Sequence, residues 1–322
     1  MPTHPTPPPT PTDPAAAPTS SPWWARPLFW VELFAAVNFA VLTLDIYLAH
    51  SMNRFAHAGE WIPFFYSLAA APALVFCWLI QGRLSPHLPG DPLDDGPPRW
   101  RRWLARWLGI LVGALGIVVG VAGMILHLQS HFFTSQTIHN LVYTAPFAAP
   151  LAYAGLGLLV ILNRTEHARS LEWARWVVLL AMGGFLGNFV LCLADHAQNG
   201  FFYPSEWIGV IAAAYAVGSL IAVAAFPASR STWRLAVLVL LAQFVVGLLG
   251  FLFHLIPNLR GPMPTLWESF IYGAPIFAPL LFADLATLAL LGLWAIALAC
   301  PGVVGRPRHR PTLDASPSSA RS

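Results

Sequence analysis

Acidic and imidazole side chains recur at the boundaries of long apolar segments in this sequence. Asp45 ends the first of these segments, Glu60 begins the second, and His127 ends the third. Ionisable groups beside apolar segments are energetically costly, and they commonly mark sites of ion binding or proton transfer. Carboxylates and imidazoles on adjacent helices hold zinc, manganese or iron in many helical bundles. Although their spacing is not a diagnostic motif such as H-E-x-x-H, these residue types at the ends of adjacent segments suggest a metal site, with the candidate ligands Asp45, Glu60, His127, His139, Asp195, Glu206, His254 and Glu268.

The elements that must position these side chains are membrane-spanning helices. Of the 322 residues, 57% are hydrophobic and only 10% are charged, which is too apolar for an ordinary soluble fold. A membrane helix needs about 20 apolar residues, and long continuous segments favour helices over the alternating strands of a barrel. We therefore expect an all-α integral membrane protein. Its eight transmembrane helices would cover residues 28–49, 61–81, 107–127, 139–162, 173–195, 207–227, 233–255 and 269–299.

The arginine residues predict the orientation of these helices. All 17 basic residues are Arg, and 15 of them lie on the side of the termini, whereas only Arg54 and Arg260 lie in the other connections. The positive-inside rule therefore places both termini in the cytoplasm. We expect a multi-pass protein of the cell inner (plasma) membrane, with the candidate ligands at its outer face.

Four short motifs recur in the same order in the two halves of the chain. Each half has an even number of helices, so the two halves would point the same way across the membrane. The pattern predicts two tandem, parallel four-helix repeats with a pseudo-two-fold axis along the membrane normal. The matched pairs are Asn38 to Asp45 with Asn188 to Asp195, Glu60 with Glu206, Gly120 to His127 with Gly247 to His254, and Tyr143 with Tyr272.

These boundaries divide the chain into five parts. We expect disordered cytoplasmic tails at 1–27 and 301–322, because both are rich in Pro and small polar residues. The first repeat would cover 28–163 and the second 173–300, joined by a cytoplasmic linker at 164–172. The glycines of the G-x-x-G-x-x-x-H motifs would allow a neighbouring helix to approach closely.

Some of the candidate ligands also have a simpler structural interpretation. A carboxylate at a helix N-terminus offsets the helix macrodipole and accepts from free N–H groups, which alone could account for Glu60, Glu206 and Glu268. Asp45 and Asp195 end their helices, where an acid is unfavourable, so they are harder to explain in this way. Four other histidines have no matched residue in the other half, and we interpret them as loop histidines: His50, His57, His131 and His196.

Proline residues interrupt the fourth and eighth apolar segments. Proline lacks a backbone N–H, so it should kink these helices and free carbonyl groups that either pack internally or line a cavity. The kinks are expected at four Ala-Pro pairs: Ala145-Pro146, Ala149-Pro150, Ala274-Pro275 and Ala278-Pro279.

The residue types do not distinguish among Zn, Mn, Fe and Cu as the bound ion. Haem is a second possibility, because two histidines on equivalent helices can act as axial ligands. The outline of eight helices in two four-helix halves with paired histidines is similar to that of haem A synthase, although the loop and histidine motifs of that family are absent. The surrounding carboxylates favour a non-haem ion.

Three functions remain open. The first is a membrane protein with a metal ion or redox cofactor at its outer face, which could be an oxidoreductase. The second is an ion- or proton-coupled transporter or channel, for which parallel repeats and proline-broken helices are suitable. The third is a non-catalytic scaffold or assembly subunit of a respiratory complex, which would contact other subunits through its outer loops. The lipid bilayer is a partner in each case, and no basic patch points to nucleic acid.

Overall fold

The structure is a computed structural model that describes residues 22–81, 98–227, 229–261 and 263–300. Within these ranges the chain forms helices and no strands. Among the described residues, seven helices are long and apolar enough to cross a membrane, so the described fold is all-α and compatible with a multi-pass membrane protein, as predicted. Most of the predicted tails, residues 1–21 and 301–322, lie outside the described ranges.

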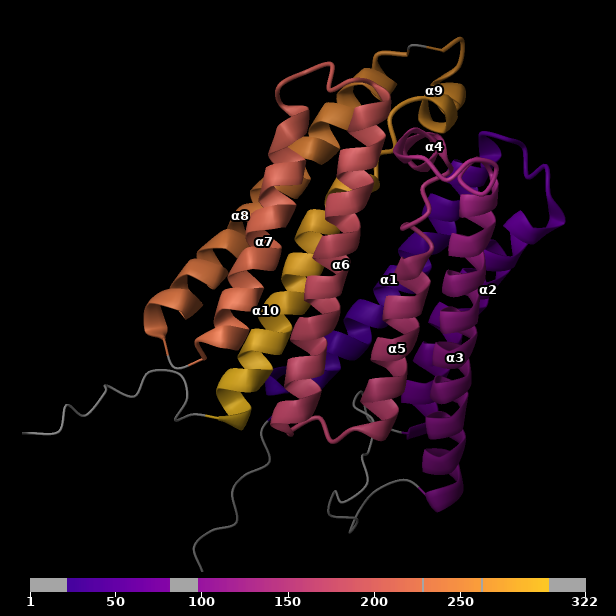
Figure 1. Cartoon of the computed structure of the whole chain (residues 1–322). Coiled ribbons are helices and arrows are strands. Elements are labelled where there is room, and N and C mark those ends of the chain that lie inside the picture. The colour runs from indigo at the N-terminus through magenta and orange to yellow at the C-terminus, as the bar shows by residue number, and fades with distance from the viewer. Residues whose placement is uncertain (1–21, 82–97, 228, 262, 301–322) are drawn as a thin grey trace, which may run out of the picture.

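The helices form two groups that lie side by side (Figure 1). The first group follows the short 3-10 helix η1 (Trp23–Ala25) and comprises α1 (Pro27–Ser51), η2 (Ala58–Glu60), α2 (Trp61–Gln81), α3 (Arg99–Gln129), α4 (Ile138–Tyr143) and α5 (Leu151–Thr165). The second group comprises α6 (Leu171–Gln198), α7 (Glu206–Ala225), α8 (Arg230–Leu259), α9 (Leu266–Tyr272), η3 (Ala278–Leu280) and α10 (Leu281–Ala299).

Two of the eight predicted segments are not continuous helices. The segment 139–162 is divided into α4 and α5, and the segment 269–299 is divided into the end of α9, η3 and α10. Both breaks fall at the Ala-Pro pairs, because proline cannot donate a backbone hydrogen bond and keeps the preceding residue out of the helical conformation. The fourth predicted span is thereby reduced to Leu151–Thr165, which has 15 residues and is shorter than the seven spanning helices.

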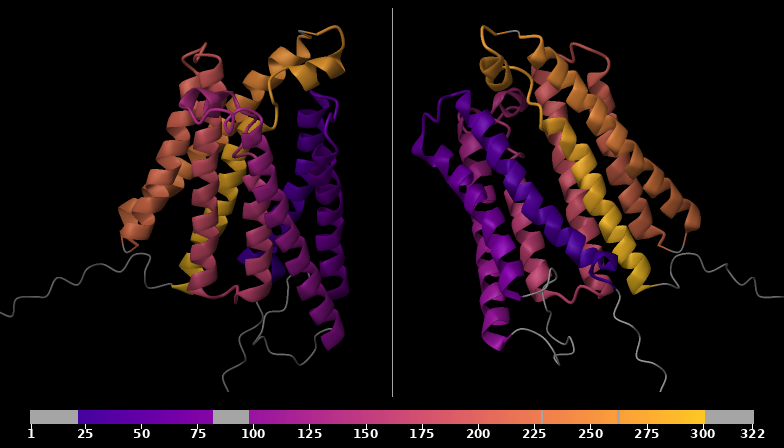
Figure 2. Two further views of the ribbon diagram at one scale, coloured as in Figure 1. Left: turned by 45° about the vertical axis from the view of Figure 1, so that its right-hand side comes forward. Right: turned by 180° about the vertical axis from the view of Figure 1, so that it is seen from behind.

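The densest packing lies within each group of helices. In the first group α1 packs on α2, α2 on α3, and α3 on α5; in the second, α6 packs on α7, α7 on α8, and α8 on α10. The groups meet where α1 contacts α9 and α10 and where α4 and α5 contact α6. Figure 2 shows the two groups after a turn of 45° and from behind.

Glycines allow α3 and α8 to lie close to the proline breaks. A Cβ atom on Gly120 would lie 2.6 Å from the backbone nitrogen of Ala154, and one on Gly123 would lie 2.8 Å from Pro150. Gly247 and Gly250 face η3 and the start of α10 in the same manner. The predicted close approach at these four glycines is therefore confirmed.

Both short helices, α4 and α9, lie at the same end of the bundle, which is the upper end in Figure 1. We call it the α4/α9 end. The α1–α2 and α6–α7 turns lie there too, whereas the α5–α6 and α7–α8 connections lie at the opposite end.

Large apolar side chains cover the outside of the bundle. Leu79 is 72% exposed, Leu238 is 65% exposed and Val118 is 63% exposed. Such a surface is unfavourable in water but favourable among lipid acyl chains, which agrees with contact between these helices and a bilayer.

Candidate functional site

Three titratable side chains approach one another at the α4/α9 end of the first group. His50 lies in the last turn of α1, Glu60 ends η2, and His127 lies in the last turn of α3. The Nδ1 atom of His50 is 3.6 Å from the Oε2 atom of Glu60. The rings of His50 and His127 meet edge to face, with their centroids 6.3 Å apart. We call these three residues the first cluster.

The second group contains a matching set of residues, which we call the second cluster. His196 lies near the end of α6, Glu206 begins α7, and His254 lies in the second-last turn of α8. The Nδ1 atom of His196 is 3.5 Å from the Oε2 atom of Glu206. His254 is close enough to His196 for the two rings to interact electrostatically.

A tight turn of the same geometry joins the histidine to the glutamate in both clusters. The N–H of Phe55 donates to the carbonyl of His50, and that of Phe201 to His196, each at 3.0 Å. Both phenylalanines are in the left-handed region, with φ of 51° and 53°, which is strained for a residue with a large side chain. Strain of this kind persists only where the surrounding structure holds it.

Aromatic stacking holds each of these turns. The ring of Phe55 stacks on Trp61, and the ring of Phe201 stacks on Trp207, in both cases with centroids 3.9 Å apart. The tryptophan is the residue directly after the glutamate, so the stack holds the backbone from which the glutamate side chain extends. The turn, the stack and the carboxylate therefore form one unit that is built twice.

The proline breaks position the remaining histidine of each cluster. Nδ1 of His127 is 2.9 Å from the carbonyl oxygen of Pro146, and Nδ1 of His254 is 2.8 Å from that of Pro275. A carbonyl can only accept, so Nδ1 carries the proton in both rings and Nε2 keeps its lone pair. The carbonyls freed by the prolines thus pack internally, which is one of the two predicted outcomes.

The glutamate oxygens that face the histidines are incompletely paired. Oε2 of Glu60 and Oε2 of Glu206 are both buried, and neither has a hydrogen-bond partner among the described residues. The contacts of 3.5–3.6 Å to the imidazoles are longer than a well-formed N–H···O hydrogen bond. Oε1 of Glu60, by contrast, accepts from Asn53 Nδ2 at 2.9 Å.

The predicted ligands Asp45 and Asp195 lie on α1 and α6, before the histidines. Asp45 interacts electrostatically with Tyr153 of α5, and Asp195 with Cys192 one turn earlier in α6. They do not occupy matching places, because Asp45 is five residues before His50 and Asp195 is one residue before His196.

His139 and Glu268, which were also predicted as ligands, lie in the short helices α4 and α9. The ring of His139 stacks on Tyr143 with centroids 4.5 Å apart. Glu268 forms a capping box, because its Oε2 accepts from the N–H of Thr265 while its own N–H donates to Oγ1 of Thr265. The structure does not bring either residue into the two clusters.

The side chains of each cluster do not converge on a single ion-binding point. Over the ranges 22–81, 98–227, 229–261 and 263–300, no group of three or more His, Cys, Asp or Glu side chains is gathered as the ligands of an ion would be. The metal site predicted from the sequence therefore stays a prediction.

Interpreting His50 and His196 as unmatched loop histidines was wrong. Both lie in helices, and each makes the same contact with the glutamate ten residues later. A motif could have revealed them, since H-x2-N-x-F-x4-E-W-I occurs at 50–62 and at 196–208. The Asn–Asp match used a spacing of 150 residues, whereas this motif repeats after 146, which is a difference of about one helical turn.

Two further buried polar contacts lie away from the clusters. Asn38 of α1 donates to Oδ1 of Asp284 in α10 at 2.9 Å, which joins the two groups of helices. Glu32 of α1 is fully buried and accepts two hydrogen bonds from the guanidinium of Arg164, at 2.6 and 2.7 Å. Arg164 therefore lies within α5 and not in an exposed connection.

Comparisons with known proteins add no assignment. No family model matches the sequence, and searches of curated proteins and of solved structures find no similar protein. The function has to be argued from the clusters themselves.

Proposed function

We propose that this chain is a membrane protein in which each cluster binds one divalent transition-metal ion. The first ion would be held by His50, Glu60 and His127, and the second ion by the residues of the second cluster. Two imidazoles and one carboxylate are a common ligand set for zinc and for non-haem iron, and they leave coordination positions open for water or substrate. Such an ion can polarise a bound group, and iron can also exchange electrons.

The observation that carries this proposal is the spacing between the imidazole and the carboxylate. Two ligands of a tetrahedral ion, each about 2.1 Å from it, lie about 3.4 Å apart. The Nδ1–Oε2 distances are 3.6 Å in the first cluster and 3.5 Å in the second. This spacing is too long for a good hydrogen bond, but it suits two ligands that share an ion. The absence of a donor to Oε2 among the described residues is then accounted for.

The proline carbonyls support the third ligand. Histidines that bind metals usually donate their other ring N–H to a carbonyl or carboxylate, which fixes the tautomer and the ring orientation. His127 and His254 have this arrangement toward Pro146 and Pro275. The His127 ring already lies edge to face with His50, with centroids 6.3 Å apart, and its Nε2 lone pair would be available to an ion that closes the cluster.

We also infer that the two groups of helices are tandem, parallel repeats with a pseudo-two-fold axis along the membrane normal. The duplicated turns, stacks and proline contacts support this inference. The α4/α9 end would face outward, because most arginines of the described residues lie near the opposite end and the positive-inside rule places them in the cytoplasm. Both ions would then be bound at the outer face of the inner membrane.

Ion-coupled transport is the second candidate function, because polar groups continue below the first cluster. Asp45 interacts with Tyr153, whose hydroxyl is 2.5 Å from that of Ser67. The Glu32–Arg164 pair lies further along α1 and α5. A chain of polar groups through one half is what a path for ions or protons requires.

The test is to measure bound metals by elemental analysis of protein purified in mild detergent. Wild type should contain two equivalents of one transition metal per chain. Glu60→Gln and Glu206→Gln should each retain one equivalent, and the double variant should retain none, because the amide cannot replace the carboxylate as an anionic ligand.

Matched control variants separate the clusters from the other predicted ligands. His139→Ala and Glu268→Gln should keep both equivalents, since neither residue contacts a cluster. Loss of metal in these two variants, with retention in Glu60→Gln, would overturn the assignment of the clusters. A metal-free wild type would overturn the proposal itself, and uptake of metal ions by proteoliposomes would then separate transport from a scaffold function.

A further inference from the structure

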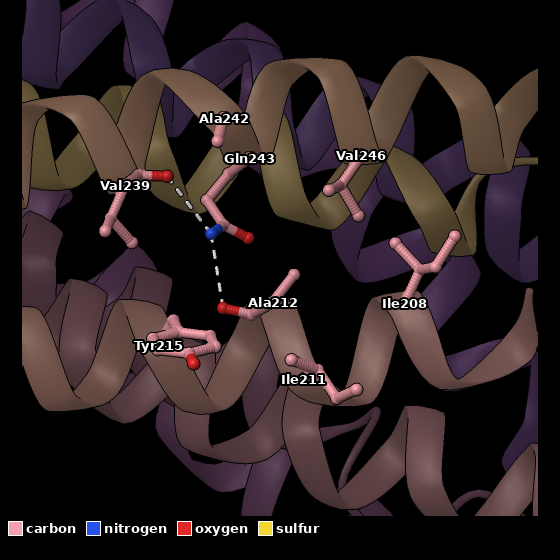
Figure 3. Close-up of a pocket in the computed structure, with 8 residues that line it drawn as sticks. All are labelled: Ile208, Ile211, Ala212, Tyr215, Val239, Ala242, Gln243 and Val246. Carbon is pink, nitrogen blue, oxygen red and sulfur yellow. Dashed lines mark hydrogen bonds between the residues drawn. The ribbon is translucent and has the colours of Figure 1, made fainter.

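A hollow of about 350 Å³ lies between α7 and α8 in the second group. Figure 3 shows its walls, which include Ile208, Ile211, Ala212 and Tyr215 of α7 and Val239, Gln243 and Val246 of α8. Ile208 and Ile211 are each about half exposed, at 49% and 51%. The hollow therefore opens toward the lipid that would surround these helices.

One buried polar group in the wall is only half satisfied. The amide nitrogen of Gln243 donates to the carbonyls of Ala212 at 3.2 Å and Val239 at 3.1 Å, so both of its N–H bonds are used. The amide oxygen is buried and has no donor among the described residues. In Figure 3 this oxygen points into the space between α7 and α8. A buried acceptor without a donor is costly, and it calls for a partner.

The same place in the first group is filled by the protein itself. Tyr66 lies five residues after Trp61, as Ala212 lies five residues after Trp207. Gly116 likewise lies four residues before Gly120, as Gln243 lies four residues before Gly247. In the first group the larger residue, Tyr66, lies on α2 and the smaller one, Gly116, lies on α3. In the second group the smaller residue, Ala212, lies on α7 and the larger one, Gln243, lies on α8.

The contacts of these residues agree with such an exchange at equivalent positions of the two groups. The hydroxyl of Tyr66 donates to the carbonyl of Val112 at 2.7 Å, and a Cβ atom on Gly116 would lie 2.6 Å from that hydroxyl. Val112 lies eight residues before Gly120, and Val239 lies eight residues before Gly247. The carbonyl that receives a phenol in the first group therefore receives the Gln243 amide in the second, where Ala212 supplies no ring in place of Tyr66. Tyr215 also lines the hollow, but it is 67% exposed.

We propose that the hollow between α7 and α8 binds a lipophilic molecule with a hydroxyl group on an aromatic ring. Its ring would occupy the space left by the absent tyrosine, and its hydroxyl would donate to the amide oxygen of Gln243. The volume lies within the usual range for small-molecule sites. An acyl chain would fill the space but would leave the Gln243 oxygen unpaired, so the structure favours a hydroxyl donor.

The test compares 4-decylphenol with its methyl ether, 4-decylanisole, because the two probes differ by a single donor. Binding is measured by isothermal titration calorimetry on the whole protein in lipid nanodiscs. The phenol should bind about five- to tenfold more tightly than the ether, which corresponds to one buried hydrogen bond. Gln243→Leu should abolish this preference, and it leaves no carbonyl unpaired because Ala212 and Val239 belong to regular helices.

A double variant supplies the filled control. Ala212→Tyr with Gln243→Gly recreates the Tyr66–Gly116 pair of the first group, so it should fold and should bind neither probe beyond simple partition into the nanodisc. Leu238→Phe, on the exposed face of α8, should bind like wild type. Equal affinity for the phenol and the ether in wild type would overturn the proposal in favour of an acyl chain. A preference that survives Gln243→Leu would also overturn it.

Discussion

The two groups of helices agree at the α4/α9 end and differ in the interior. Both groups have the histidine–glutamate contact, the left-handed phenylalanine and the histidine on a proline carbonyl. Below the clusters, five polar side chains of the first group have apolar residues at the corresponding positions of the second group. When the proposed repeats are aligned by their shared motifs, Tyr153 is paired with Phe282, Ser67 with Ala213, Glu32 with Val178, Asn163 with Gly292 and Arg164 with Leu293.

This difference indicates which buried polar residues are required by the clusters and which are required only by the first group of helices. If the clusters bind ions, the buried Glu32–Arg164 pair is not required for it, because the second cluster is built without such a pair. The pair has a structural setting of its own. Trp78 donates to Oε2 of Glu32, and Asn163, which donates to Oε1, accepts in turn from Trp173 of α6. It therefore ties α1, α2 and α5 to the second group of helices.

The largest effect is expected from breaking this pair. Glu32→Val leaves the guanidinium of Arg164, which is 2% exposed, without its carboxylate. Removing one partner of a buried ion pair costs about 3–5 kcal/mol. The free energy of unfolding, measured by denaturant titration in detergent, should fall by that amount.

The residues of the second group provide the control. The triple variant Glu32→Val, Asn163→Gly, Arg164→Leu removes both charges and should recover most of the lost stability, because apolar replacements of a buried pair are often neutral. A single Glu32→Val variant as stable as wild type would show that the comparison of the two interiors is mistaken.

A second prediction exchanges the residues of the hollow. Tyr66→Ala removes a ring that packs on Phe39 and Tyr153 with centroids 5.6 and 5.7 Å away, which should lower the free energy of unfolding by about 2–4 kcal/mol. Adding Gly116→Gln should restore part of it and should create binding of 4-decylphenol in the first group. Calorimetry and denaturant titration on the single and double variants would check both results. No gain of phenol binding in the double variant would contradict the exchange.

The spanning helices could be predicted from the sequence because hydropathy is a local property. The predictions for 139–162 and 269–299 were less accurate because an apolar segment does not reveal whether a proline bends a helix or ends it. The carbonyls of Pro146 and Pro275 accept hydrogen bonds from the histidines of α3 and α8, so the break in the helix costs little free energy. That compensation comes from a neighbouring helix, and local sequence does not contain it.

Only some residues of the candidate site could be predicted from the sequence. His127 and His254 stood out because glycines at a fixed spacing accompany them, whereas His50 and His196 were hidden by a match displaced by one helical turn. Arg164 was counted among the loop arginines because it borders a polar segment. Its partner Glu32 is 132 residues away in the sequence, so only the tertiary fold could pair them.

A third prediction uses the glycines that face the proline breaks. A Cβ atom on Gly120 would lie 2.6 Å from Ala154 N and 2.8 Å from Pro150 O, whereas one on Gly247 would meet its nearest atoms at 3.1 and 3.2 Å. Gly120→Ala should therefore lower the free energy of unfolding by about 1–3 kcal/mol, and Gly247→Ala by clearly less. Parallel denaturant titrations would test the order, and a larger effect at Gly247 would contradict it.

The smallest effect is expected at the caps of α4 and α9. The hydroxyl of Thr265 accepts from the N–H of Glu268, and the N–H of Thr265 donates to the Glu268 carboxylate. Thr137, by contrast, only accepts from the N–H of Asn140. Thr265→Ala should cost about 1 kcal/mol and Thr137→Ala less, because Thr265 loses both the acceptor for the N–H of Glu268 and the hydroxyl that donates to the Glu268 carboxylate, whereas Thr137 loses only an acceptor. Hydrogen exchange of the backbone amides in each short helix would measure the loss locally. Equal losses in α4 and α9 would mean that the Glu268 carboxylate adds nothing to its cap, which would leave that side chain free for the ligand role predicted from the sequence.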